Sequence, residues 1–335
     1  MKAPLRTSLC DLLGCDYPIL QAGMGGVARS ELVAAVVAAG GYGFLGMVRE
    51  SPDLVAREID AVRERTDRPF GVNLIPASTD SELFDAELAV CIEKKVHSMC
   101  FFWDVRADAV ARARQAGCRV AYQVGSVEDA VAAEKAGADV IIAQGVEAGG
   151  HVRGTTSSIV LVPQVVQAVS VPVVASGGFG SGAGLVAALA LGAEGIHCGS
   201  AFLATTESFA HDYHKQRIVE ARSEDTLITD AFAINWPPHA RVRVIGNSTT
   251  GTLGGRLLGH DPRTMERVAI ADEEGRPIYR FSTDSPLRSM TGSLEPLALY
   301  AGEIAGSITS VPAAGELVER IAKEAEAVLD RLQGR

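Results

Sequence analysis

Short apolar runs alternate with amphipathic stretches over the first two thirds of the chain. The apolar runs are four or five residues long and rich in β-branched side chains, which is typical of buried parallel strands. They predict strands at Tyr17–Gln21, Tyr42–Leu45, Phe70–Leu74, Ser98–Phe102, Arg119–Gln123, Val140–Ala143, Val171–Ala175 and Gly195–Cys198. Apolar residues recur with helical period over residues 30–39, 53–65, 81–95, 106–116, 127–136, 158–169 and 183–191.

Several of these predicted helices end at a glycine, where helices commonly stop. The glycines are Gly40, Gly117, Gly137 and Gly192. Eight strands separated by helices favour parallel pairing, and we therefore predict a (β/α)8 TIM barrel. A doubly wound sheet is the alternative.

The alternation of strands and helices stops after about residue 207. Residues 211–290 contain Trp236-Pro237-Pro238 and a Gly/Thr-rich patch, and they predict a small inserted lid or substrate domain. The barrel would then comprise residues 1–210 and 291–335. Helical period returns over 293–309 and 313–332, and the second of these stretches is expected to be an amphipathic helix that closes the barrel.

Composition narrows the class of protein. The chain has 335 residues, 47% of them hydrophobic, which is enough for one large core and a smaller domain. The net charge is −10 without a Lys/Arg run, so nucleic-acid binding is not expected. The apolar runs are too short to span a membrane. The six cysteines form no CxxC pair, so we expect no metal site. Cys100, Cys118 and Cys198 lie in apolar runs and are expected to be buried reduced thiols, in a cytoplasmic protein without a signal peptide.

The sixth predicted strand runs into the sequence QGVEAGGH at residues 144–151. Parallel α/β enzymes place their chemistry in loops at the carboxyl ends of strands. The glycine pair Gly149-Gly150 would let the backbone approach a ligand, and His151 would present a titratable ring. A loop histidine bonded to its own backbone is the alternative.

The last two predicted strands end in glycine-rich loops, Ser176-Gly177-Gly178 and Cys198-Gly199-Ser200. In barrels, the loops after these strands often bind phosphate through backbone N–H groups. Tight turns without a ligand are one alternative. A dinucleotide fingerprint across Gly178, Gly180 and Ala183 is another, disfavoured because no acidic ribose ligand ends the next strand.

The first and third predicted strands also end in glycine or amide residues. The first is followed by Ala22-Gly23-Met24, and the third contains Asn73. An amide both donates and accepts hydrogen bonds, which suits the edge of a heterocycle. Asn73 as a turn residue and Met24 as a core residue are the alternatives.

Four segments together resemble the nitronate monooxygenase family, formerly called 2-nitropropane dioxygenases. They are PILQAGM (18–24), PFGVNL (69–74), QGVEAGGH (144–151) and ASGGF (175–179) with Gly199-Ser200. The resemblance implies a (β/α)8 barrel with a smaller domain and non-covalently bound FMN. It also implies oxidation of alkyl nitronates by O2 to a carbonyl compound and nitrite. Flavin-dependent enoyl-acyl carrier protein reductases and some NADH:quinone reductases share the same segments.

The resemblance also implies the roles of individual residues. His151 matches the catalytic histidine, which would bind the substrate anion or abstract a proton. The expected FMN-binding residues are Ala22, Gly23, Met24, Asn73, Gln123, Gln144, Gly149, Gly150, Ser176, Gly177, Gly178, Cys198, Gly199 and Ser200. Among them, Gly178, Gly199 and Ser200 would hold the phosphate, at the position that the strand ends had already indicated.

Three positions depart from the family pattern. Gln123 stands where some relatives carry a lysine near the flavin, and a neutral amide would lower the flavin's reduction potential. Ser200 replaces a threonine and keeps the hydroxyl. Glu303 replaces a glutamine and would disfavour an anionic substrate if it faced the site.

Other functions remain open from the sequence. The main alternative is an NAD(P)H-dependent FMN reductase of the enoyl-acyl carrier protein or quinone type, for which Arg241 and Arg243 could form a docking patch. A flavin-binding partner subunit is disfavoured by the presence of His151, and a cysteine-nucleophile barrel by the lack of a cysteine in a catalytic loop. The expected partners are a small-molecule substrate and O2. Use of NAD(P)H and a homodimer stay open.

Overall fold

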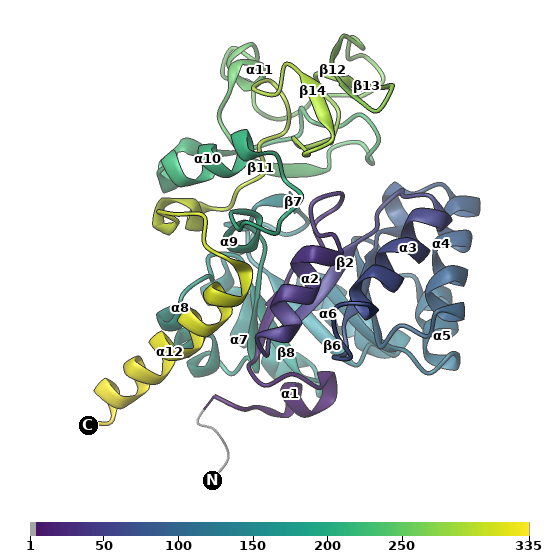
Figure 1. The fold of residues 1–335 in the computed structure, drawn as a ribbon. Helices are drawn as coiled ribbons and strands as arrows, with labels where there is room; N and C mark the ends of the chain where they lie inside the picture. The colour runs from purple at the N-terminus through teal and green to yellow at the C-terminus, as the bar shows by residue number, and fades with distance from the viewer. Residues whose placement is uncertain (1–4, 335) are drawn as a thin grey trace.

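The computed structural model describes residues 5–334 (Figure 1). Eight parallel strands form a closed barrel in the order β1-β2-β3-β4-β5-β6-β8-β9. They are β1 (Ile19–Gln21), β2 (Tyr42–Gly46), β3 (Gly71–Leu74), β4 (Ser98–Phe102), β5 (Arg119–Val124), β6 (Val140–Gln144), β8 (Val173–Ser176) and β9 (Gly195–Cys198). Parallel pairing of β1 with β9, Leu20 opposite His197, closes the ring. The predicted TIM barrel is confirmed, and the doubly wound sheet is excluded.

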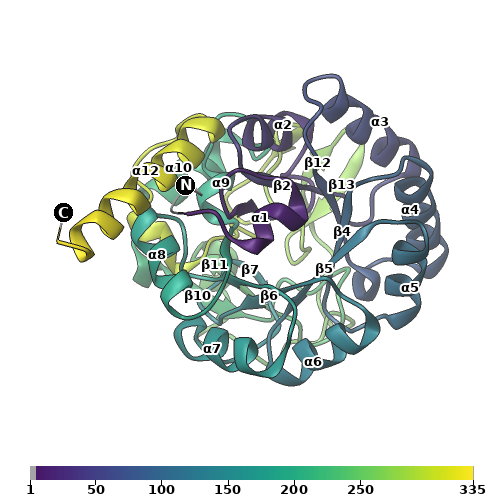
Figure 2. The same cartoon turned by 90° about the horizontal axis from the view of Figure 1, so that it is seen from below.

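Helices surround the barrel, as the view along its axis shows (Figure 2). They are α2 (Ser30–Ala38), α3 (Pro52–Arg63), α4 (Ser81–Glu93), α5 (Ala107–Gln115), α6 (Val127–Ala136), α7 (Ser158–Ala168) and α8 (Gly182–Ala190). The terminal helix α12 (Ala314–Leu332) packs on α8 and α2. All eight lie within two residues of their predicted bounds. A short helix that was not predicted, α1 (Ser8–Leu13), covers the end of the barrel where the strands begin (Figure 2).

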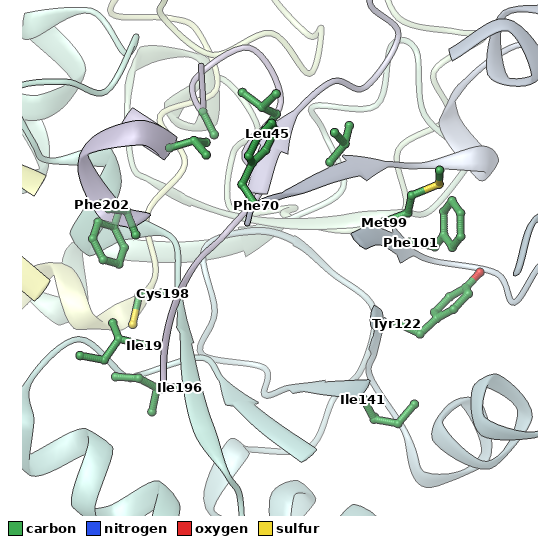
Figure 3. Close-up of a cluster of buried hydrophobic side chains, with 14 of the residues drawn as sticks. Ile19, Leu45, Phe70, Met99, Phe101, Tyr122, Ile141, Ile196, Cys198 and Phe202 are labelled. Atoms are coloured by element: carbon green, nitrogen blue, oxygen red, sulfur yellow. The ribbon is translucent and has the colours of Figure 1, made fainter. Parts of the chain in front are cut away.

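The core follows the alternation of side chains along each strand. In β6, Ile141 and Ala143 face the helices, whereas Val140 and Ile142 point into the barrel. The helix-facing layer includes Ile19, Met99, Tyr122 and Ile196 (Figure 3). The six cysteines are free and buried, as predicted for Cys100, Cys118 and Cys198. Most residues on both faces of the strands are therefore apolar, which explains why the strands appear in the sequence as nearly continuous apolar runs.

Residues 209–302 form two small antiparallel sheets above the carboxyl ends of the barrel strands (Figure 1). One has the order β10 (Thr226–Thr229), β11 (Arg241–Ile245), β7 (Gly150–Val152), and the other β13 (Arg276–Tyr279), β12 (Ala269–Glu273), β14 (Met290–Gly292). The region also holds α10 (Asp212–Glu220), η2 (Ser223–Asp225) and α11 (Ser248–Gly251). Because β7 comes from the loop after β6, the barrel and this region share a sheet. The predicted boundaries at residues 210 and 290 stay a prediction.

The helix predicted over 293–309 is wrong. This segment is extended and ends in a short 3-10 helix, η3 (Glu303–Ser307). Leu297, Leu299 and Ala301 enter one apolar cluster, whereas Ala298 and Tyr300 contact another on the opposite side. Residues that are buried on both sides of an extended chain form a continuous apolar run, and such a run can be mistaken for a helix.

The described residues contain no helix with the length and apolar character that crossing a membrane requires. Within residues 5–334, no three His, Cys, Asp or Glu side chains gather as a metal-binding group. Two histidines near the start of the region 209–302, His211 and His214, have different surroundings. His211 caps α10, and His214 is buried with Nε2 bonded to the Tyr300 carbonyl at 3.0 Å.

Candidate active site

A cavity of about 1050 Å³ lies between the carboxyl ends of the barrel strands and residues 209–302. Its position is the one at which barrel enzymes carry their active sites. Of the predicted site residues, His151 and the following line it: Ala22, Gly23, Met24, Asn73, Gln123, Gln144, Gly149, Gly150, Ser176, Gly177, Gly178, Gly199 and Ser200. The structure therefore gathers into one cavity residues that are up to 178 positions apart in the chain.

Cys198 is the one predicted cofactor residue that lies outside the cavity wall. Its side chain is 1% exposed and belongs to the helix-facing core. Side chains alternate along β9, so when the preceding His197 points into the barrel, Cys198 must point outward. Cys198 still shapes the site, because its carbonyl accepts a hydrogen bond from the Ala22 backbone N–H at 3.0 Å.

His151 lies on β7 rather than in an open loop, and aromatic rings surround it. Its ring stacks on Trp236, with centroids 3.3 Å apart and planes 10° from parallel. The Trp103 ring is perpendicular to the His151 ring, with centroids 6.3 Å apart, and the centroid of Tyr300 is 5.8 Å from that of His151. Gln144 holds the strand by donating from Nε2 to the His151 carbonyl at 2.9 Å. The ring position is thus fixed by packing and by the backbone.

The imidazole of His151 is kept neutral. Burial lowers its pKa well below the usual value, and the nearby charge of Arg49 lowers the pKa further. Its Nε2 atom is buried and has no hydrogen-bond partner among residues 5–334. A buried polar atom without a partner is costly, so this nitrogen is suited to a ligand that binds in the cavity.

A second histidine faces the cavity from β9. It is His197, whose side chain lines the cavity and is 5% exposed. Nδ1 lies 3.1 Å from the Ser176 hydroxyl, and Nε2 has no partner among the described residues. Burial lowers its pKa to about 4, so this ring is neutral as well. Because alternate residues of a strand point into the barrel, the position of His197 in β9 could have predicted that its side chain faces the cavity.

The loops after β8 and β9 have the geometry of an anion cradle. Gly177 and Gly178 have φ angles of 95° and 77°, which strain any other residue. Ser200 accepts a hydrogen bond from the Gly302 N–H at 2.9 Å, which leaves its hydroxyl hydrogen available. Backbone without side chains can bring N–H groups close to a phosphate. Together with the unpaired Nε2 atoms of both histidines, these loops fit a flavin mononucleotide.

Two of the predicted glycines have a packing reason. A side chain at Gly23 would collide with Asn73, and one at Gly149 would collide with the backbone of Ala301 and Gly302. At Gly149 another segment of the chain makes a close approach, whereas a side chain at Gly150 would meet nothing within 4 Å. These contacts bring Gly302 next to the end of β6 and so help to close the cavity.

Glu303 does not line the cavity; it forms an ion pair with Arg243 at 3.1 Å. Arg243 is 7% exposed and also donates to the Val146 carbonyl at 3.1 Å, so it is not available for the docking patch considered for Arg241 and Arg243. Arg153 pairs with Asp104 at 3.1 Å, outside the cavity wall. The neutral Gln123 does line the cavity.

A closed parallel barrel with a cavity at the carboxyl ends of its strands defines the class of α/β-barrel enzymes. The profile of the nitronate monooxygenase family matches residues 6–324, and the chain belongs to this family. A probable nitronate monooxygenase of Staphylococcus aureus is 34% identical over 68% of this chain and 76% of that protein. A (3aS,4S,5R,7aS)-5-hydroxy-7a-methyl-1-oxo-octahydro-1H-indene-4-carboxyl-CoA dehydrogenase of Mycobacterium tuberculosis is 31% identical over 96% of each chain.

Solved structures agree with this assignment. FabK from Thermotoga maritima superposes with a TM-score of 0.80 and is 31% identical, over 98% of this chain and 99% of that one. A nitroalkane oxidase from Streptomyces ansochromogenes also gives a TM-score of 0.80 at 31% identity, over 97% and 100%. The family and the fold are therefore shown, and the chain is an oxidoreductase.

Proposed function

We propose that this enzyme binds FMN and uses it to oxidise alkyl nitronates with O2, giving a carbonyl compound and nitrite. The observation that carries the proposal is the surrounding of His151. A neutral imidazole with an unpaired Nε2 lies in a cavity with aromatic walls, and the positive charge of Arg49 acts on it. A small planar anion with an apolar substituent fits such a site.

FMN would supply the electron-accepting group and the site of reaction with O2. The turn at Gly177-Gly178 and the segment Gly199-Ser200 would hold its phosphate. Asn73, Gln123 and His197 would offer polar atoms to the ring system. Each of these roles rests on the position of the residue in the cavity wall.

His151 would bind the nitro oxygen atoms of the substrate by donating a hydrogen bond from Nε2. For a neutral nitroalkane, the same nitrogen in its unprotonated tautomer would remove the proton from the α-carbon. Because the pKa of His151 is lowered, the ring keeps its neutral form at working pH and can serve in either tautomer. Trp236 and Tyr300 would enclose the apolar substituent and exclude water.

The deciding experiment is the visible spectrum of the purified protein under anaerobic conditions. Propyl-2-nitronate is added to one cuvette and NADH to another, after reconstitution with FMN. Loss of the oxidised flavin spectrum with the nitronate alone supports the proposal, and nitrite should then form when air is admitted. A flavin that reacts with NADH and not with the nitronate would contradict it.

The cavity supports a second candidate, a reductase or dehydrogenase of acyl thioesters that exchanges electrons with NAD(P)H. The cavity extends from the barrel mouth to Leu54 and Glu58 on α3, so its volume is larger than a small nitronate needs. The mycobacterial relative is named for a CoA-linked substrate. The NADH cuvette separates the two candidates, and a homodimer remains a prediction from the sequence alone.

A further inference from the structure

Arg49 is a cavity residue that the sequence did not single out. It follows β2, and its backbone has a φ of 61°, in the left-handed region that residues other than glycine rarely adopt. Strained backbone of this kind is retained where the surrounding structure holds it, and it is common at functional sites. Arg49 lines the cavity.

The guanidinium bridges to the two aromatic walls of the His151 site. Nη1 donates to the Asn235 carbonyl at 3.1 Å, and the next residue, Trp236, stacks on His151. Nη2 donates to the Thr283 hydroxyl at 3.1 Å, and the Thr283 carbonyl accepts from the Tyr300 hydroxyl at 2.9 Å. Both acceptors are neutral.

Arg49 forms no ion pair with a carboxylate among residues 5–334, although its charge acts on the buried carboxyl of Glu87. Six carboxylates, among them Glu50 and Asp284, lie in the same wall. Glu50 is paired with Arg29 at 2.8 Å, and Asp284 with Arg276 at 3.1 Å. A guanidinium has five N–H donors, and the two bonds above use two of them. A positive charge and free donors are therefore available inside the cavity.

A hydrogen bond to α4 stabilises the turn that carries Arg49. The Glu87 carboxyl on α4 is fully buried, and its Oε1 accepts from the Glu50 backbone N–H at 2.9 Å. The bonds above and this one hold Arg49 from both sides, so little side-chain entropy would be lost when it binds a ligand.

We propose that Arg49 is the residue that binds the anionic group of the substrate beside His151 and so selects anions over neutral compounds. The proposal rests on the proposed function and extends it to the recognition of charge. A guanidinium fork matches two oxygen atoms on one centre, as in a nitronate or a carboxylate.

The test compares the holoenzyme with Arg49→Gln, Arg49→Lys and Arg57→Gln. Arg57 is an exposed residue at the outer end of the same cavity and serves as the charge-matched control. KM and kcat are measured for propyl-2-nitronate and for neutral 2-nitropropane, and the dissociation constant of nitrite is measured from the flavin spectrum. A lost charge-assisted hydrogen bond predicts a rise of about tenfold or more in the nitronate KM and in the nitrite constant of Arg49→Gln.

KM for 2-nitropropane and all constants of Arg57→Gln should change less than about twofold. If Arg49→Gln does not fold, Arg49→Lys decides, since loss of the fork should raise the nitronate KM severalfold without affecting the neutral substrate. An unchanged nitronate KM, or equal losses for both substrates, would overturn the proposal. If the wild type does not oxidise nitronates, the proposed function fails, and nitrite binding by wild type and Arg49→Gln still decides on Arg49.

Discussion

At the scale of single residues, the unpaired Nε2 of His151 is the clearest point of chemistry in the cavity. His151→Ala removes this group and leaves the predicted phosphate cradle intact. We expect kcat to fall by about 10²- to 10⁴-fold, the usual contribution of a positioned acid or base, with FMN still bound. Steady-state kinetics and the visible spectrum check both parts. Turnover equal to that of the wild type would remove His151 from the mechanism.

The lowered pKa of His151 also predicts the pH dependence of the reaction. A histidine with the ordinary pKa of about 6.5 would be half protonated at that pH. Activity that needs the neutral ring would then fall as the pH drops below about 6.5. Because burial and Arg49 lower the pKa, the neutral ring persists, and log kcat/KM should stay level through pH 6.5 and decline only at more acidic pH. An inflection at 6.5 that His151→Ala abolishes would contradict this.

The buried Glu87 predicts a separate effect on stability. Burial raises its pKa to about 8, so the folded state keeps a proton that the unfolded state releases near pH 4.5. The contribution to stability is present below pH 4.5 and is lost as pH rises toward 8. Between these values the free energy of unfolding should fall by about 1.4 kcal/mol per pH unit from this group.

Glu87→Gln keeps an oxygen acceptor for the Glu50 N–H and removes the titration. Urea unfolding at pH 5, 6, 7 and 8 should therefore give a flatter dependence on pH for the variant than for the wild type. Parallel curves would show that Glu87 does not hold a proton in the folded state.

The residues that the sequence could and could not predict differ in one respect. His151 and Gly177-Gly178 follow directly from strand ends, so the chain itself places them at the mouth of the barrel. Arg49 depends on contacts with Asn235 and Thr283, which are more than 180 positions away along the chain. Such contacts have no local pattern in the sequence.

At the scale of elements, the cavity depends on how the loop after β6 meets the segment after Tyr300. Gly149 packs directly against the backbone of Ala301 and Gly302, and Gly302 bonds to Ser200. Gly149→Ala should force these segments apart, lower the free energy of unfolding by about 2 kcal/mol or more, and weaken FMN binding. Chemical unfolding and an FMN titration measure the two effects.

Gly251→Ala is the matched control for this substitution. Gly251 is in α11, and a Cβ there would meet nothing within 4 Å. It should leave FMN binding unchanged and leave stability equal or slightly higher, since alanine favours a helix. If Gly149→Ala also left stability and FMN binding unchanged, the contact of Gly149 with Ala301 and Gly302 would not support the cofactor site.

The segment that packs against Gly149 also shows where periodicity predicts helices and strands correctly and where it does not. The barrel helices have one apolar face, and their 3.6-residue period is visible in the sequence. Residues 297–301 are buried on both sides, between two clusters contributed by distant parts of the chain, so the segment has no single apolar face. Strand β7 is likewise defined by its partner β11 rather than by its own three residues.

At the scale of the whole molecule, several contacts fasten residues 209–302 to the barrel. His151 on β7 is paired with Val242 on β11, Arg49 bonds to Asn235, and Arg288 pairs with Glu31 at 3.2 Å. Since the cavity lies between the two parts, FMN should bind only when both are folded. We therefore expect a single cooperative transition in differential scanning calorimetry, rather than separate transitions for barrel and insert.

FMN at about 100 times its dissociation constant should stabilise this single folded state by about 2.7 kcal/mol and raise Tm accordingly. Riboflavin has the same ring system without the phosphate. It should raise Tm much less at equal concentration, because the loops at Gly177-Gly178 and Gly199-Ser200 would then hold no anion. Equal shifts with FMN and riboflavin would contradict the phosphate cradle, and two resolved transitions would contradict the coupling of the two parts through the cavity.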